Sequence, residues 1–485
     1  MSLRFRLVKQ EELGSLCEMY RKVIADMRRR GLNQWEWGMY PNADILGEDI
    51  AAGTLYRMDE DGSLVGAFVL CPRQEEGYAR LSWHFGLRPV TLHRLALDPE
   101  CLGLGLGQRA MVFVKEEARR LGYDSLRLDT SSRNERALKL FRGSMTREVG
   151  VIHFDDPTID FYCFESPLGE ACPILPIRMH PAYRYGDMTP WGGDGLRSLY
   201  GMDIPEERTG EALVVSAIPG LESRDDTGVR LTKLIARYGK ALVGQDREFP
   251  LLLKFIAAKE SLSVQVHPGD AYAREHEGKL GKTEAWVILH AQEGARLVYG
   301  LQAGVEMAAL EAALQQGEDL EPLLRQVPVQ AGDVFYMPSG MVHAIGGGIV
   351  LYEIQQSSDV TYRVWDYGRL NGKGEPRELH IRQALDVIDP RLAGEKTRWQ
   401  AEGASGFKRL LSVPAFMLDS VLVEGELALS PRPESFRLLT ALDPLTLAWD
   451  GAEMALGAGE SALLAVSCPA LALRGKGRAL LAAAR

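Results

Sequence analysis

An amide, a carboxylate and two imidazoles are the side chains in this 485-residue sequence that could together bind one metal ion. Gln265 and His267 stand two residues apart, and residues at that spacing on a strand point to the same face. Glu284 follows after a loop, and a neighbouring strand would bring its carboxylate to the pair. His343 is the obvious fourth donor, although it lies far away in the sequence. A mixed set of nitrogen and oxygen donors suits catalytic zinc better than structural zinc, which usually relies on thiolates.

Short apolar runs surround these residues and predict the strands that must position them. The runs 249–256, 262–267, 284–289 and 294–299 are separated by turns, and this pattern is typical of a jelly-roll barrel. Residues 304–326 break the pattern with apolar positions that predict an inserted helix. We therefore expect the metal donors to project from the strands of a mainly-β domain.

A turn-rich segment leads to His343. Its pattern, Gly332-x5-Pro338-x-Gly340-x2-His343, matches the second motif of the cupin family. Gly and Pro would turn a strand corner so that the imidazole projects into the barrel.

Four segments together resemble the type I mannose-6-phosphate isomerases, particularly the shorter bacterial members. The segments are Gln265-x-His267-Pro268, Gly281-Lys282-Thr283-Glu284, the Gly332–His343 motif, and 353–359 followed by 361–369. The resemblance covers residues 175–395 closely. It implies zinc held by Gln265, His267, Glu284 and His343, an active-site Arg363 with Lys282 nearby, and a hexose 6-phosphate as substrate.

The reaction implied is the interconversion of mannose 6-phosphate and fructose 6-phosphate, in which a proton moves between C1 and C2 through an enediol. A base must reach the carbon-bound proton, and Lys282 is a candidate if burial beside zinc lowers its pKa. Arg363 stays protonated, so it could stabilise the oxyanion or bind the phosphate. One departure from the family lies in residues 210–219, where Leu213, Val214 and Ile218 replace a Trp-Glu and a His-Pro. It leaves open an alternative, a sugar-phosphate-binding cupin without catalysis.

The first part of the chain contains a glycine-rich loop, residues 102–108, between a predicted strand at 91–98 and a helical stripe at 110–121. The backbone N–H groups of such a turn and the helix dipole favour a pyrophosphate. A helix is also predicted over 11–30, and strands over 63–71 and 78–83. Since several strands precede the loop, the order differs from that of a dinucleotide-binding fold.

This order resembles the GNAT family of acetyl-CoA-dependent N-acetyltransferases. The matching parts are the strand 92–98, Gly105-x-Gly107, Asn134-x-x-Ala137-x-x-x-Phe141 and Gln34-Trp35. The resemblance implies acetyl-CoA and an unknown amine acceptor. The cofactor-binding residues that it implies are Leu97, Leu102, Gly103, Gly105, Gly107, Gln108 and Asn134.

Two positions bear on whether this first domain is an acetyltransferase or only binds acetyl-CoA. Leu102 stands where the family usually has Gln or Arg, and Phe141 stands where many members carry a Tyr that protonates the leaving thiolate. An acetyl-CoA sensor is therefore the alternative to an acetyltransferase. His84 and His93 are candidate bases.

The sequence as a whole predicts an α+β GNAT-like domain (residues 1–168), a zinc-binding cupin isomerase domain (169–390) with a helical insertion, and a second, metal-free β-barrel (391–485). Residues 391–485 contain no His. A net charge of −10 argues against nucleic acid as a partner. The sequence has no apolar run of membrane-spanning length and no signal peptide. Six scattered cysteines favour a reducing, cytoplasmic location.

Overall fold

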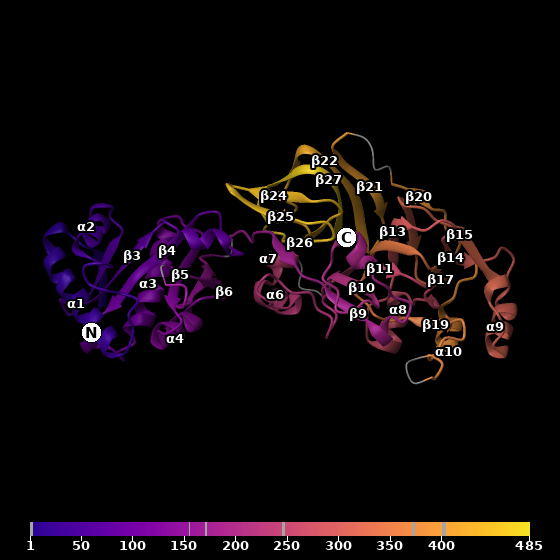
Figure 1. Ribbon diagram of the computed structural model, residues 1–485, viewed down its shortest axis with the longest axis horizontal. Helices are drawn as coiled ribbons and strands as arrows, with labels where there is room; N and C mark the ends of the chain where they lie inside the picture. Colours follow the sequence, from indigo (N-terminus) through magenta and orange to yellow (C-terminus); the bar gives the residue numbers. More distant parts are fainter. Residues whose placement is uncertain (1–2, 155, 170–171, 245–247, 371–373, 400–403) are drawn as a thin grey trace. The chain divides into compact units, whose positions relative to one another are not determined.

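The computed structural model describes residues 3–154, 156–169, 172–244, 248–370, 374–399 and 404–485. The chain divides into two compact units, Met1–Leu175 and Pro176–Arg485, drawn from indigo to purple and from magenta to yellow in Figure 1. The boundary predicted at residue 168 lies close to this division. The further boundary at residue 390 stays a prediction.

The first unit is a mixed α/β fold around one twisted sheet of order β1-β2-β3-β4-β5-β7-β6. Its strands are β1 (Leu3–Leu7), β2 (Leu55–Glu60), β3 (Ser63–Cys71), β4 (Pro89–Leu97), β5 (Ser125–Ser131), β6 (Arg147–Ile152) and β7 (Phe161–Pro167). Its helices are α1 (Leu13–Arg29), α2 (Ala43–Ala51), α3 (Leu106–Arg120) and α4 (Glu135–Ser144), with short 3-10 turns η1 (Gln10–Glu12), η2 (Glu76–Arg80) and η3 (Pro99–Cys101).

Helices cover both faces of this sheet, because successive strand residues point to opposite sides. On β3, Val69 packs with the buried residues of α1 and α2, while the adjacent Phe68 packs with those of α3 and α4. Among the described residues, no helix combines the length and the apolar character needed to span a membrane.

Strands β4 and β5 run parallel but pair only at their beginnings. The register joins Pro89–Thr91 to Ser125–Arg127 and goes no further, so the two strands diverge towards their C-terminal ends. The loop after β4 leads into α3, whose N-cap is Gly105 with a φ of 72°. The diverging strands and this helix start frame one end of a cavity.

The strand predicted over residues 78–83 is wrong. Residues Glu76–Arg80 form the 3-10 turn η2. The buried Tyr78 carbonyl accepts a hydrogen bond from Trp83 Nε1 at 2.8 Å, and the Tyr78 hydroxyl donates to Asp129 at 2.7 Å. Tyr78 and Trp83 are residue types that favour strands, but here their hydrogen bonds stabilise a turn that packs against the sheet.

The second unit contains two sheets that face each other, as expected for a jelly roll. The first sheet is β20 (Thr397–Arg398), β16 (Asp333–Met337), β13 (Glu284–Ala291), β18 (Ile349–Gln356), β11 (Leu251–Ala258), β10 (Thr209–Val215) and β9 (Ala182–Tyr185), in that order. The second is β15 (Leu324–Pro328), β14 (Arg296–Leu301), β17 (His343–Ile345), β12 (Val264–Val266) and β19 (Tyr362–Trp365). A shared core that includes Trp286, Phe335, Tyr299 and Ile345 fills the space between them.

Helices occupy the connections of this unit. They are α5 (Gly195–Tyr200), α6 (Leu231–Tyr238), α7 (Lys240–Val243), α8 (Asp270–Glu277), α9 (Met307–Gln316) and α10 (Ile381–Val387), with 3-10 turns η4 (Gly186–Met188) and η5 (Glu321–Leu323). The predicted insertion is present as α9, but it is shorter than residues 304–326. Gly317 ends the helix with a φ of 67°, and strand β15 begins at Leu324.

A third sheet follows in the chain and packs on the first. It consists of β21 (Gly406–Ser412), β22 (Phe416–Leu429), β27 (Leu471–Ala484), β23 (Arg437–Ala441), β26 (Ser461–Leu464) and β8 (Ile177–Met179), in that order. In addition, β24 (Leu445–Trp449) pairs with β27, and β25 (Ala452–Leu456) pairs with β24. Tyr352 on β18 meets Thr440 on β23 through a buried hydrogen bond of 3.2 Å. The third sheet therefore covers the outer face of the first.

Candidate functional site

Three buried side chains converge inside the jelly roll. They are His267, Glu284 and His343. Each offers one donor atom, and these three atoms lie within 4.8 Å of one another. His267 Nε2 is 3.5 Å from one oxygen of Glu284, and His343 Nε2 is 3.2 Å from the other. The three residues are at most 1% exposed, so water competes little for these donors.

Both sheets contribute to this cluster. Glu284 opens β13 in the first sheet, while His343 opens β17 and His267 follows β12 in the second. The cluster exists because the two sheets face each other, which brings together residues that are distant in sequence.

The tautomers of the two histidines leave the same ring nitrogen available. His267 Nδ1 donates to the Val360 carbonyl at 3.0 Å, and His343 Nδ1 donates to the Met341 carbonyl at 2.9 Å. A hydrogen on Nδ1 leaves the Nε2 lone pair free in a neutral imidazole. Backbone carbonyls that fix a tautomer in this way are common around metal-bound histidines.

Gln265 and Arg363 lie beside the cluster on neighbouring strands. Gln265 is directly opposite His343 on β17 and opposite Arg363 on β19. The Gln265 amide nitrogen is 3.5 Å from His343 Nε2, and a half-turn of the amide would present its oxygen as a ligand instead. Arg363 is partly buried, and its guanidinium donates to the Glu378 carbonyl at 2.7 Å.

Lys282 reaches into the centre of the cluster from the loop before β13. Its ammonium nitrogen is 3.0 Å from Glu284 Oε2 and 2.9 Å from His267 Nε2. The side chain is buried, so the chain places a positive group among the predicted metal donors.

The electrostatics of the cluster suit a divalent cation. Burial, followed by the Lys282 ammonium, holds the pKa of His267 well below its ordinary value, so this imidazole is neutral. Burial alone would raise the pKa of Glu284, but Lys282 and the two histidines hold it well below its ordinary value. Within the described residues, neither oxygen of Glu284 accepts a well-formed hydrogen bond, although such oxygens are normally paired when buried. A carboxylate and two imidazoles are donors that fit zinc.

Gln355 is a polar residue of this site to which the sequence assigned no role. It lies opposite Glu284 across β13 and β18, and the residue is fully buried. Its amide nitrogen donates to the carbonyls of Gln356 and Ser358, each at 2.7 Å, and this fixes the orientation of the amide. Its oxygen has no hydrogen-bond partner in the described part of the chain. The sequence marked the segment 353–359 but gave no reason to choose this residue.

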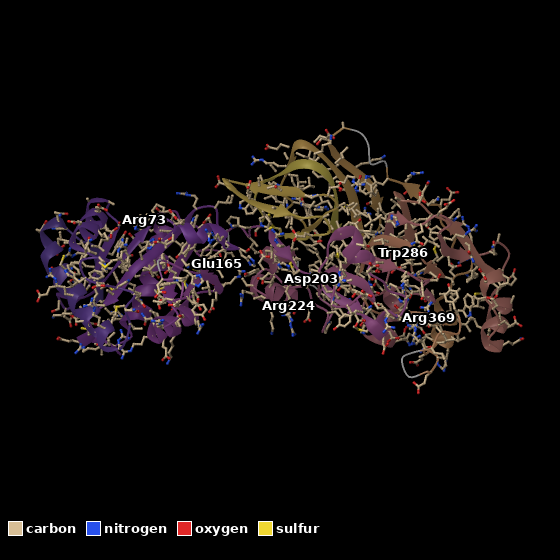
Figure 2. All side chains as sticks on the ribbon, in the orientation of Figure 1. Arg73, Glu165, Asp203, Arg224, Trp286 and Arg369 are labelled. Carbon is tan, nitrogen blue, oxygen red and sulfur yellow. The ribbon has the colours of Figure 1, made fainter. Side chains whose placement is uncertain are left out.

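A buried charge network continues from the cluster across the first sheet. Lys254 Nζ lies 3.0 Å from Glu353 and 3.5 Å from Glu211. Glu353 also accepts a hydrogen bond of 2.9 Å from Nε1 of Trp286, which Figure 2 labels among the strands of this unit. Buried charges persist only when they are paired, so these residues stabilise one another.

The departure noted in residues 210–219 concerns packing. Leu213 and Ile218 are buried together with Leu252 in a small apolar cluster. None of these three side chains belongs to the group of described residues that could hold a metal.

The first unit has a site of its own, a cavity of about 550 Å³ between the diverging ends of β4 and β5. Leu97, Leu102 and Asn134 line it, as does Phe141. Leu97, Leu102 and Asn134 are the three predicted cofactor-binding residues that line this cavity.

The remaining predicted residues lie on the loop and helix start beside the cavity. Gly103 and Gly105 adopt positive φ values of 89° and 72°, and Gln108 is exposed. Gly107 permits a close helix contact, since an added Cβ would lie 3.0 Å from Leu140 on α4.

The two candidate bases differ in position. His93 lines the cavity, and burial lowers its pKa to about 4, so its imidazole is neutral. His84 is buried outside the wall of this cavity.

A known family matches a segment in each part of the chain. Residues 18–144 match the acetyltransferase (GNAT) family, and residues 178–296 match the catalytic domain of the type I phosphomannose isomerases. Both resemblances drawn from the sequence are thereby confirmed, as is the predicted fold class.

Individual relatives match the second part. A mannose-6-phosphate isomerase of Streptococcus mutans is 48% identical over 204 residues, and mannose-6-phosphate isomerase ManA of Bacillus subtilis is 44% identical over 207 residues. Each alignment covers 41% of this chain and 64% of the relative.

Solved structures are similar to a larger share of this chain than the sequence relatives are. The crystal structure of the mannose 6-phosphate isomerase from Bacillus subtilis is similar over 64% of this chain and 99% of that chain, with 31% identity and a TM-score of 0.55. A zinc-bound mannose 6-phosphate isomerase matches with 17% identity and a TM-score of 0.50 over the same share of this chain, which shows a common fold.

Proposed function

We propose a function on the premise that this chain belongs to the type I phosphomannose isomerase family. The second unit is a zinc-dependent isomerase that interconverts mannose 6-phosphate and fructose 6-phosphate. The observation that carries this proposal is the buried group of His267, Glu284 and His343, with both Nε2 lone pairs turned to one point.

Zinc would be held by these three residues and by the amide oxygen of Gln265. When bound, it would polarise the substrate oxygens at C1 and C2 and so favour the enediol. The donors are two imidazoles, one carboxylate and one amide, and a set without thiolates is typical of catalytic zinc sites.

Two basic side chains act beside these donors in our proposal. Lys282 moves the proton between C1 and C2 as an uncharged amine, which a cation bound beside it would favour over the ammonium form. Its nitrogen lies within 3.0 Å of two of the donors. Arg363 stabilises the negative charge of the substrate from the neighbouring strand. Gln355 accepts a hydrogen bond from a substrate hydroxyl through its unpaired oxygen.

The test compares two histidine variants of the full chain. We expect His343→Ala to lose both zinc, measured by metal analysis, and isomerase turnover. His290→Ala alters an exposed histidine on β13 and should keep both. Full activity in a metal-free preparation would refute the proposal, and sugar-phosphate binding without turnover would favour the non-catalytic cupin.

For the first unit, we propose that acetyl-CoA binds between the ends of β4 and β5, with its pyrophosphate at the start of α3. The match to the acetyltransferase (GNAT) family and the cavity beside this helix start support this. An amine would attack the acetyl carbonyl carbon, so that a C–N bond forms, the C–S bond breaks and coenzyme A leaves as a thiol. Calorimetric titration with acetyl-CoA tests binding, and absence of heat would reject it.

Turnover separates an acetyltransferase from a sensor. Release of the coenzyme A thiol in the presence of amines would identify an enzyme, while binding without release would identify a sensor. We place the protein in the cytoplasm, because its six cysteines are free thiols.

A further inference from the structure

We propose that the cavity of the first unit binds a small amine that also carries an anionic group, with the ammonium at Glu75 and Asp129 and the anion at Arg73. This inference rests on the function proposed for the first unit, and it names the class of its acetyl acceptor. Its basis is the distribution of paired and unpaired charges around one end of the cavity.

The cavity has two ends, which a bend in β4 separates. Leu97, Leu102 and Asn134 line the end at the start of α3. The bend is at Arg94, which has a φ of 51°, and the pairing of β4 with β3 shifts register there. His93, Glu75, Asp129 and Arg73 line the other end.

Two other arginines that line the cavity are already neutralised. The buried Arg94 guanidinium binds the Asp49 carboxylate and donates to the Tyr40 hydroxyl at 2.8 Å. Arg30 forms an ion pair of 2.9 Å with Asp26. Neither arginine is available to a ligand or to another carboxylate without breaking an existing pair.

Two carboxylates, in contrast, lack a basic partner. Asp129 is partly buried and accepts a hydrogen bond only from the Tyr78 hydroxyl at 2.7 Å, within the described residues. Glu75 lies 3.5 Å from His93 Nδ1, and no arginine or lysine in the described part of the chain forms an ion pair with it. Carboxylates in a partly buried position are stabilised by a cation.

The histidine beside Glu75 is itself an acceptor at this point. His93 Nε2 is 3.2 Å from the Arg73 carbonyl and can only donate to it, so Nδ1 carries a lone pair. Burial lowers the pKa of His93 to about 4, which keeps the ring neutral. Two acceptors therefore face each other at 3.5 Å, and a donor such as an ammonium group would satisfy both.

Arg73 supplies the opposite charge. Its side chain is exposed, lines the cavity and forms no ion pair in the part of the chain that the structure describes. Figure 2 labels it on the first unit. A guanidinium without an ion pair lines the same cavity as two carboxylates without a basic partner. This combination fits a ligand that carries both charges, since guanidinium binds carboxylate or phosphate through paired hydrogen bonds.

The walls of the cavity limit the size of the ligand. Trp35, Tyr40, Phe154 and Phe161 line the same space, and aromatic faces attract ammonium groups. A volume of about 550 Å³ shared with the acetyl end of the cofactor fits a small molecule.

Four probes in two matched pairs test the proposal. Ethanolamine phosphate is compared with ethanolamine, and L-phenylalanine with L-phenylalaninamide, by calorimetric titration of the full chain with and without coenzyme A. In at least one pair, the anionic amine should bind at least about tenfold more tightly than its partner, a ratio equal to about 1.4 kcal/mol. The pair that shows this preference identifies the anion as a phosphate or a carboxylate.

Variants test which residues bind the ammonium group and the anion of the probes. Arg73→Gln should abolish the preference for the anionic member of each pair, while Arg80→Gln, an exposed arginine outside the cavity, should keep it. Asp129→Asn and Glu75→Gln should weaken all four probes. Circular dichroism melting checks that each variant is folded.

Equal binding within both pairs, no binding of any probe, or a preference that survives Arg73→Gln would overturn the inference. A parallel titration with acetyl-CoA keeps this result separate from the proposed function. If acetyl-CoA fails to bind but the anionic amines bind through Arg73, the cofactor assignment is wrong, and the cavity binds the anionic amine as a ligand and not as an acetyl acceptor.

Discussion

At the scale of single residues, backbone carbonyls and neighbouring charges determine what each side chain can do. His267 and His343 are metal donors in our proposal because each donates its Nδ1 hydrogen to a backbone carbonyl, which leaves the Nε2 lone pair for the metal. His93 also donates to a backbone carbonyl, but it does so through Nε2, so its lone pair is on Nδ1 and faces Glu75. The same residue type therefore serves different purposes in the two units.

Arg363 provides a test that separates chemistry from metal binding. We expect Arg363→Ala to lower the kcat/KM of the isomerase by about 10- to 100-fold, the loss typical of a hydrogen bond to a charged group. Zinc content should not change, because Arg363 contributes no donor. Arg391→Ala, at a side chain that is 86% exposed, is the matched control. Unchanged kinetics of Arg363→Ala would remove this residue from the active site.

Asp129 gives a prediction about pH. Burial raises its pKa to about 6, and the groups that face it are the Tyr78 hydroxyl, Glu75 and the Cys163 thiol. Asp129 is therefore charged at pH 7 and takes up a proton as the pH falls through 6, so the affinity for L-phenylalanine should fall between pH 7 and pH 5. His93 stays neutral over this range because its pKa is about 4.

The check is a series of calorimetric titrations at several pH values. Asp129→Asn should bind weakly throughout and show a flatter profile. A wild-type affinity that stays constant from pH 7 to pH 5 would contradict the role of Asp129.

At the scale of elements, strands β12, β13 and β17 and one loop bring the proposed metal donors together. Gln265 on β12 lies between His343 on β17 and Arg363 on β19, so strand register determines these neighbours. The loop after β12 includes α8 and returns to Lys282, whose backbone N–H donates to the Pro268 carbonyl at 3.0 Å. This loop fixes where β13 begins, and therefore where Glu284 lies.

Gly281 is the position at which this loop has no space for a side chain. An added Cβ would lie 2.5 Å from the Asp270 nitrogen and 2.6 Å from the Gly269 carbonyl carbon, both of which are backbone atoms. We expect Gly281→Ala to reduce the free energy of unfolding by about 1–3 kcal/mol and to lower zinc content, because Lys282 and Glu284 must move. Chemical denaturation and metal analysis measure the two effects.

Gly457→Ala is the matched control in the same unit. Its added Cβ would have its closest contact at 3.6 Å, with the Glu460 side chain, which is ordinary packing. Equal zinc content in Gly281→Ala and in the control would show that the loop does not position the donors.

At the scale of the whole molecule, two compact units share one chain. Each contains its own hydrophobic cores and its own candidate site. Within the second unit, β8 at Ile177–Met179 pairs with β26, so the third sheet contains residues from the beginning of that unit. A fragment of residues 391–485 would lack this strand.

Two independent units predict two thermal transitions. Removal of zinc by a chelator should lower only the transition of the second unit. Acetyl-CoA at about 100 times its Kd should stabilise only the first, by about 2.7 kcal/mol, because a ligand stabilises the state that binds it. Differential scanning calorimetry of the full chain measures both, and a single transition that moves with both ligands would contradict independence.

The sequence by itself determined the families, the main elements and the residues that could act as metal donors. These features are local: the spacing of Gln265 and His267, the Gly and Pro turns before His343, and the glycine-rich loop before α3 depend on neighbouring residues. The strand wrongly predicted at residues 78–83 shows the limit of such patterns. Tyr78 suits a strand by type, but its contact with Asp129 lies across 51 residues of sequence.

Only the tertiary structure decided which side chains meet and which charges remain unpaired. Glu284 faces the two histidines because two sheets pack together, and Gln355 becomes relevant only through its register with Glu284. Arg73, Glu75 and Asp129 come from different segments, and their significance depends on Arg94 and Arg30 being neutralised elsewhere. Pairing in space and burial are properties of the folded chain, and local sequence contains no measure of either.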